Sequence, residues 1–148
     1  MILPIVAYGD PVLKKKAVNV EKHHLKLKEL ISDMWETMYA AYGVGLAAPQ
    51  IGESLRLFIV DGSPFAQDKS LDHVEQQELR TFKKVFINPE IISYNGLKES
   101  FNEGCLSIPD VREDVTRLST IEIVYYNEQF EKVEEEISGL AARIVQHE

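Results

Sequence analysis

The sequence predicts an α+β domain in which antiparallel strands surround a late helix and an early amphipathic helix packs on them. Three observations support this fold class: helical periodicity over residues 21–42, several later runs with strand composition, and a second helical stretch over residues 139–148. A chain of 148 residues with 45% apolar side chains has the size of one domain and can bury a sizeable core. We therefore expect a single domain over residues 1–148.

The stretch from Glu21 to Tyr42 is the clearest helix. Its apolar residues recur at steps of three and four and form one stripe, made of Leu27, Leu30, Ile31, Met34, Met38 and Ala41. Gly43 is a natural stop for this helix. His23 and His24 fall in its polar first turn, where we expect solvated side chains.

Strand composition first appears at residues 55–60 and returns at 84–88. Pro89 then predicts an edge or a bend, because proline cannot donate to a strand ladder. The intervening segment, residues 65–81, is polar and acidic with little periodicity. We expect it to be a surface excursion with at most a short helix.

The second half of the chain contains further strand signals. The Asn-Gly dipeptide at 95–96 predicts a turn. Residues 120–126 alternate well between apolar and polar, and Asn-Glu at 127–128 leads into another strand near residues 132–137. The chain then ends in the late helical stretch.

Composition limits the class of protein. Sixteen basic and 24 acidic side chains give a formal net charge of −8. This charge argues against general binding to phosphate backbones and hence against a nucleic acid as substrate, although a local basic patch could still exist. A single cysteine favours a reducing compartment, the cytoplasm. The apolar start is too short for a signal peptide, and no apolar run reaches the roughly 20 residues of a membrane helix.

Cys105 is the only cysteine and lies in Glu-Gly-Cys-Leu-Ser at residues 103–107. We expect an extended or turning segment there, because Pro109 disfavours a helical residue before it. A thiolate is a good metal ligand. A buried structural cysteine and a redox-sensing thiol remain alternatives.

The last residues, Gln-His-Glu at 146–148, match the first half of a helical H-E-x-x-H motif. Side chains four apart on a helix share a face, so two imidazoles can bind one metal while the glutamate reaches a water molecule. The second histidine of the motif would fall beyond Glu148. By itself a His-Glu pair is a weak signal, and an ordinary helical histidine is the alternative.

A third segment runs from Gly43 to Gln50 with the sequence Gly-Val-Gly-Leu-Ala-Ala-Pro-Gln. Small residues and two glycines allow a ligand to lie against the main chain, and Gln50 offers an amide donor. The segment lacks the lysine and hydroxyl of a phosphate-binding loop. A tight turn after the long helix is the alternative.

Together the three segments resemble the peptide deformylase family, in which G-φ-G-φ-A-A-x-Q, E-G-C-φ-S and Q-H-E-x-x-H occur in this order. The resemblance implies that Cys105 and His147 bind one divalent metal, Fe2+ with Zn2+, Ni2+ or Co2+ as substitutes, on a metal-binding late helix. It also implies that Glu148 is the general acid/base toward a metal-activated water. The implied oxyanion donors are the Gln50 side chain and the Leu106 backbone N–H.

The substrate implied by the resemblance is the N-formylmethionine of a nascent polypeptide, and its formyl group is removed by hydrolysis. Main-chain pairing with Val44 and Gly45 on one side and with the backbone near Arg112 on the other would bind the peptide. The methionine side chain would enter an apolar pocket walled by Val44, Leu140, Ile144 and His147. The nascent-chain substrate also implies the ribosome as a partner.

Because the chain stops inside the third motif, we expect it to be truncated at the C-terminus relative to its parent protein. Two alternatives stay open. One is a catalytically impaired formyl-peptide-binding fragment or pseudoenzyme that ends at Glu148. The other, a zinc endopeptidase, is less favoured because such sites seldom use a thiolate.

Overall fold

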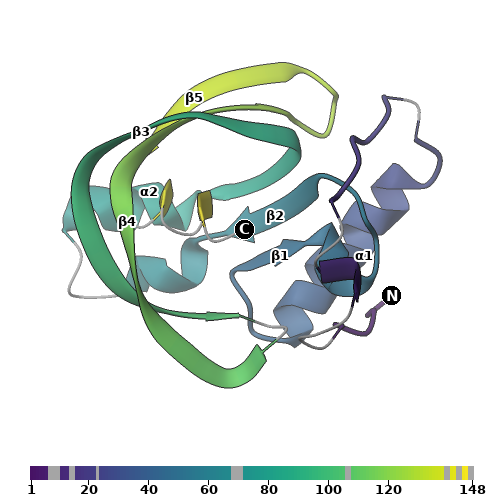
Figure 1. Ribbon diagram of the computed structural model, residues 1–148, viewed down its shortest axis with the longest axis horizontal. Helices are drawn as coiled ribbons and strands as arrows, with labels where there is room; N and C mark the ends of the chain where they lie inside the picture. The colour runs from purple at the N-terminus through teal and green to yellow at the C-terminus, as the bar shows by residue number, and fades with distance from the viewer. Residues whose placement is uncertain are drawn as a thin grey trace.

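The computed structural model describes residues 1–6, 11–13, 16–22, 24–67, 72–105, 108–138, 141–142 and 145–146. Residues 12, 67, 97–105 and 108–117 are described by their backbone alone. The described residues form a five-stranded sheet in the order β1-β2-β3-β4-β5, and every neighbouring pair is antiparallel. Figure 1 shows the long β3–β4 hairpin curving around the region where the chain ends.

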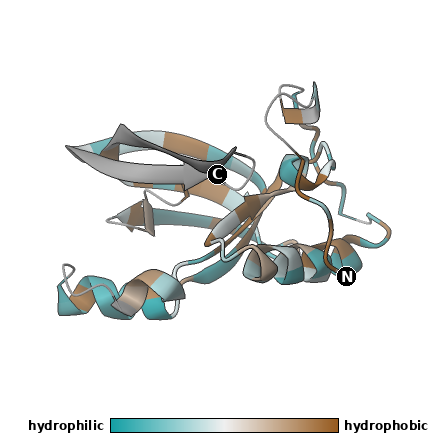
Figure 2. Ribbon diagram, turned by 90° about the horizontal axis from the view of Figure 1, so that it is seen from below, coloured by the Kyte–Doolittle hydropathy of each residue, from teal (hydrophilic) through white to brown (hydrophobic). Residues whose placement is uncertain are grey.

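The strands are β1 Gly45–Ala47, β2 Leu57–Asp61, β3 Lys83–Cys105, β4 Ile108–Tyr126 and β5 Lys132–Ser138. The α-helices are α1 Leu27–Ala40 and α2 His73–Arg80, and three short 3-10 helices are η1 Pro11–Leu13, η2 Ala48–Ile51 and η3 Ser63–Gln67. In Figure 2 the β3–β4 hairpin lies on one side of the molecule and both α-helices lie on the other. This arrangement confirms the α+β prediction. Among the described residues no helix has the length and apolar character needed to cross a membrane.

The predicted apolar stripe of α1 is confirmed, but the helix begins later than expected. Ile31, Met34 and Met38 are buried and pack with β1 and β2 in one core cluster. The expected start at residue 21 is wrong, because Lys26 adopts a left-handed conformation with φ 68° and interrupts the right-handed path. His24 is therefore an exposed residue before the helix, and His23 lies outside the described residues.

The predicted turn at residues 95–96 is wrong, because β3 continues through it. Gly96 has φ 83°, and the pairing with β4 shifts register between Asn95 and Lys98. This is a β-bulge, in which an extra residue is accommodated without reversing the chain. Pro89 lies in a similar register shift next to Asn88, which has φ 50°. The ladder thus tolerates a residue that cannot donate a hydrogen bond.

The segment over residues 65–81 contains the predicted short helix, but it is more than a surface excursion. Its helix α2 is capped by Asp72, whose carboxylate accepts a hydrogen bond from the Glu75 N–H at 2.8 Å. Leu79 on this helix has no exposed surface and packs into the core with Ala66 and Phe82. The segment is anchored by these few apolar side chains.

The late helical stretch packs inside the curve of the sheet. Residues 141–142 and 145–146 are helical. The side chains of Ala141, Ala142 and Val145 are buried with Phe86 on β3 and Ile121 on β4. Two alanines at this point let the helix lie close to the strands. The core therefore holds residues 141–142 and 145 against the strands.

Candidate active site

Strand β1 forms one edge of the described sheet and contains the first predicted substrate-binding residues. It pairs with β2 through Gly45↔Val60 and Leu46↔Ile59, and the Val44 carbonyl accepts a hydrogen bond from the Asp61 N–H at 2.8 Å. Backbone groups in an antiparallel strand alternate between its two sides. Val44 and Leu46 therefore direct their backbone groups toward β2, and Gly45 directs its N–H and C=O toward the open edge.

Gln50 is held at the end of this edge strand. It lies in η2, its side chain is 8% exposed, and its Oε1 accepts the Ala47 N–H at 2.9 Å. Its backbone carbonyl accepts the Val6 N–H at 2.8 Å. The Ala47 N–H fixes one end of the amide, so the side chain has a defined orientation beside β1.

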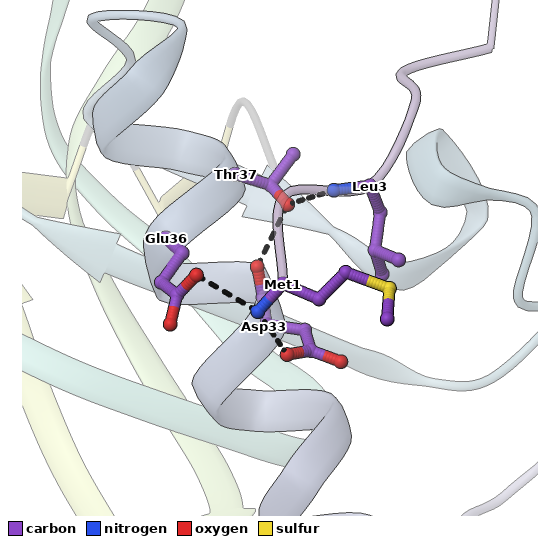
Figure 3. Close-up of polar contacts among 5 residues, drawn as sticks. All are labelled: Met1, Leu3, Asp33, Glu36 and Thr37. Carbon is purple, nitrogen blue, oxygen red and sulfur yellow. Dashed lines mark hydrogen bonds and ion pairs between the residues drawn. The ribbon is translucent and has the colours of Figure 1, made fainter.

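The N-terminal segment connects this turn to α1. The Met1 α-ammonium lies 2.8 Å from carboxylate oxygens of both Asp33 and Glu36, and these two contacts raise the pKa of the amine. The Leu3 N–H donates to Thr37 Oγ1 at 2.8 Å, and Thr37 Oγ1 donates to the Asp33 carbonyl at 2.7 Å (Figure 3). The first six residues thus link one face of α1 with the turn that contains Gln50.

A buried carboxylate supports the start of β1 and was missed by the sequence analysis. Asp61 is 8% exposed, and its two oxygens accept hydrogen bonds from Tyr39 Oη at 2.6 Å and from the Ser63 N–H at 2.9 Å. Burial alone would raise the pKa of Asp61, but these donors and the nearby Lys83 charge outweigh it and lower the pKa. Burial, together with Asp61, raises the pKa of Tyr39.

The sequence analysis gave no role to Asp61, which directly follows the predicted strand at residues 55–60. An aspartate directly after four apolar strand residues was the available signal, but it did not identify Tyr39 as the partner. Their contact joins α1 to β2 across 22 residues of sequence. The Asp61 N–H also donates to the Val44 carbonyl. The contact between Tyr39 and Asp61 therefore stabilises the backbone at the point where the open edge begins.

Cys105 is the last residue of β3, which confirms the predicted extended segment. Its backbone pairs with Ile108, and the backbone of Gly104 pairs with Arg112 on β4. The main chain near Arg112 therefore lies beside the cysteine segment. The side chains of Cys105 and Arg112 are outside the described part, and so is Leu106.

The late helix is fastened to β4 immediately before the predicted metal ligand. Gln146 Nε2 donates to the Leu118 carbonyl at 2.8 Å, and the neighbouring Val145 is 2% exposed. The other predicted residues of this helix, Leu140, Ile144, His147 and Glu148, lie outside the described residues. Within the described part, no three His, Cys, Asp or Glu side chains gather as a metal site. The side chains of the predicted ligands Cys105 and His147 lie outside the described residues, so their convergence stays a prediction.

Comparison with known proteins identifies the class. The chain matches the family model described as polypeptide deformylase over residues 2–148 and belongs to this family. Members of the family are metal-dependent enzymes that remove the N-formyl group from nascent polypeptides. The identification confirms the resemblance found in the three sequence segments.

Individual relatives agree with the family. The peptide deformylase of Christiangramia forsetii is 60% identical over the whole chain, which covers 76% of that relative, and the one from Flavobacterium johnsoniae is 54% identical with the same coverage. The crystal structure of the Thermotoga maritima peptide deformylase is 40% identical, with a TM-score of 0.85, over 100% of this chain and 89% of that one. A Met-Ala-Ser-bound class I type b peptide deformylase from Acinetobacter baumannii is 34% identical, with a TM-score of 0.85, over 100% and 91%.

Proposed function

We propose that this chain hydrolyses the formyl group of N-formylmethionyl peptides that bind along the open edge of β1. The observation that carries this proposal is the geometry of that edge. Gly45 directs its peptide groups outward, and Gln50 is held at the end of the same strand by the Ala47 N–H. A peptide that adds to such an edge is bound through its main chain, which tolerates many side chains.

The same geometry sets the direction of the bound peptide. Strand β1 runs from Gly45 toward Gln50, and Gln50 is the proposed donor to the formyl oxygen. The peptide therefore starts near Gln50 and runs back past Gly45, antiparallel to β1. Because the carbonyl of Val44 is bound by Asp61, we assign main-chain pairing to Gly45 and a pocket wall to the side chain of Val44.

The remaining contacts of the substrate are also proposals. The backbone near Arg112 would bind the other side of the peptide. The methionine side chain would enter an apolar pocket formed by Val44, Leu140, Ile144 and His147. Val44 is partly buried and packs against the core cluster that contains the late helix, which supports a wall at this position. The Met-Ala-Ser bound to the Acinetobacter baumannii relative supports a peptide ligand.

The donor set fits a divalent transition metal. A Cys105 thiolate and a His147 imidazole are the ligand types that bind iron, zinc, nickel and cobalt. We propose Fe2+ as the metal, with Zn2+, Ni2+ and Co2+ as substitutes. A divalent metal there would supply Lewis-acid activation of a water molecule. The two segments that contain these ligands are attached to paired strands. Cys105 is the last residue of β3, and Gln146 binds the late helix to β4.

Three further groups of the chain would act on the substrate. Glu148 would take a proton from the attacking water and deliver it to the departing amine. The Gln50 side-chain amide and the Leu106 N–H would donate to the oxyanion that forms at the formyl carbon. Removal of one such donor typically raises the barrier by about 3–4 kcal/mol.

The experiment is formate release from formyl-Met-Ala-Ser by protein loaded with metal under anaerobic conditions. We expect turnover by the unmodified chain, a loss of about 100-fold or more in Glu148→Gln with its metal retained, and loss of bound metal in Cys105→Ser. Binding of the peptide without formate release, in protein that holds metal, would contradict the proposal and favour a binding module. Cleavage of an internal amide in an unformylated peptide would favour an endopeptidase.

We also propose that the chain acts in the cytoplasm and meets its substrate at the ribosome, because N-formylated chains emerge there. The acidic net charge argues against a nucleic acid as the substrate. Co-sedimentation with ribosomes that expose a formylated nascent chain tests this. If the same amount of the protein sediments when ribosomes are omitted, the proposal is contradicted.

A further inference from the structure

The N-terminal segment connects a buried threonine on α1 with the turn that contains Gln50. The Leu3 N–H donates to Thr37 Oγ1 at 2.8 Å, and three residues later the Val6 N–H donates to the Gln50 carbonyl at 2.8 Å. Pro4 lies between these two contacts, and its ring fixes one backbone dihedral of the connection. A short, partly rigid piece of chain therefore joins the threonine to Gln50.

Thr37 is the firmer of the contacts between this segment and α1. It is 1% exposed, and its hydroxyl donates to the Asp33 carbonyl at 2.7 Å, which leaves an oxygen lone pair for the Leu3 N–H (Figure 3). The ion pairs of the Met1 α-ammonium are the weaker contact, because the Met1 side chain is 76% exposed and exposed ion pairs contribute little. The position of the segment on α1 therefore depends mainly on one buried hydroxyl.

At its other end the segment supports the backbone of Gln50. The Gly52 N–H donates to the Pro49 carbonyl at 3.0 Å and closes the turn locally, whereas the Gln50 carbonyl accepts a bond from the N-terminal segment. The Ala47 N–H binds Oε1 of the same residue, so its backbone and its side chain are held by different parts of the chain. A catalytic donor has to stay within about 0.5 Å of its productive position. The bond from Val6 helps to set that position.

We propose that Thr37 is a positioning residue for the reaction, and that it acts through the N-terminal segment on the oxyanion donor Gln50. This inference rests on the proposed function and adds a residue of α1 to it. Without the hydroxyl the Leu3 N–H loses its acceptor, and the Val6 N–H no longer holds the backbone of the donor in place. The peptide itself pairs with Gly45, so the effect falls on kcat and not on KM.

The test measures formate release from formyl-Met-Ala-Ser by the metal-loaded chain and its variants. Thr37→Val keeps the size of the side chain and removes the hydroxyl. We expect kcat to fall about three- to tenfold, with KM unchanged within about twofold, because a misplaced donor raises the barrier of the chemical step. Thr37→Ser keeps the hydroxyl and should retain the kcat of the unmodified chain. All three proteins should hold the same amount of metal.

A double-mutant cycle tests the route through Gln50. Gln50→Ala should lower kcat by about 100-fold or more. In that background Thr37→Val should have no further effect on kcat, because no donor is left to position. Leu27→Ala is the matched control, since Leu27 is buried at the opposite end of α1, roughly 15 Å from Thr37 along the helix axis. It should lower Tm and leave kcat unchanged.

Val6→Pro approaches the same connection from its other end, because proline has no N–H to donate to the Gln50 carbonyl. It leaves α1 intact and should reproduce the loss of kcat. Hydrogen exchange at the Val6 amide gives a readout without turnover. In Thr37→Val we expect this exchange to become about threefold faster or more, and in Thr37→Ser to stay unchanged.

The outcomes separate this inference from the proposed function. If the unmodified, metal-loaded chain releases no formate, the proposed function fails and the inference fails with it. If that chain turns over, an unchanged kcat in Thr37→Val or in Val6→Pro overturns the inference alone. An equal loss of kcat from Thr37→Val with and without the Gln50 side chain, or a similar loss in Leu27→Ala, indicates a general structural effect and also overturns it.

Discussion

Asp61→Asn is the most informative single perturbation of the described site, because it removes one negative charge and keeps the shape. The Asp61 carboxylate accepts hydrogen bonds from Tyr39 Oη at 2.6 Å and from the Ser63 N–H at 2.9 Å. A hydrogen bond to a charged group contributes about 1.5–3 kcal/mol. Asparagine keeps one acceptor oxygen and loses the charge, so we expect a loss of about 2 kcal/mol in the free energy of unfolding at pH 7.

The pH dependence of this loss follows from the lowered pKa of Asp61. A carboxyl group whose pKa is lower in the folded than in the unfolded state contributes stability above the unfolded pKa, roughly 3.9 for aspartate. That contribution disappears as the pH falls through the folded pKa, because the unfolded chain then binds the proton more readily. The difference between the unmodified chain and Asp61→Asn should therefore shrink below about pH 4.

Urea unfolding at a series of pH values between 7 and 3 measures this difference directly. Glu90→Gln is the matched control, since Glu90 is an exposed carboxylate on β3, and it should change the unfolding free energy by less than about 0.5 kcal/mol. Tyr39→Phe should raise the pKa of Asp61 in an NMR titration, because it removes one of the hydrogen-bond donors to this carboxylate. A stability difference that stays constant, or grows, down to pH 3 would refute the reasoning.

Two further predictions concern packing and the N-terminal segment. Phe86→Ala should cost about 3–5 kcal/mol in urea unfolding, because the fully buried ring of Phe86 contacts Phe58 and Tyr125 with centroids 4.6 and 4.4 Å away; a cost below 1 kcal/mol would show that the site collapses around the vacancy. Thr37→Val should cost about 1–3 kcal/mol and increase hydrogen exchange at the Leu3 amide, because the buried hydroxyl accepts that N–H; Thr37→Ser should preserve both properties, and unchanged exchange in Thr37→Val would contradict the contact.

Several elements were predictable because their signals are local. The apolar stripe of α1 needs only the helical period, and the strand at residues 120–126 needs only alternation. The extended segment around Cys105 was expected because Pro109 disfavours a helical conformation at the residue directly before it. The family follows from three short segments whose order along the chain requires no knowledge of the fold.

The misses have a common cause in long-range pairing. Asn-Gly at 95–96 has the composition of a hairpin turn, but β4 pairs with β3 on both sides of it and converts it into a bulge. The segment over residues 65–81 has the composition of a solvated loop, yet Leu79 finds a place in the core. The left-handed Lys26 likewise has no local signal, since lysine favours helices.

The sequence by itself determined the chemical groups of this protein: one thiol, a His-Glu pair, a glutamine after a glycine-rich segment, and an acidic, largely amphipathic chain. Only the tertiary structure decided which backbone groups face the open edge and which side chains become partners. Strand register turned the peptide groups of Gly45, and not those of Val44, toward the open edge. Burial made Asp61 a partner of Tyr39. Residue identity is a local property, whereas strand register and burial depend on segments far away in the chain. Register and burial are therefore defined only when those segments have packed.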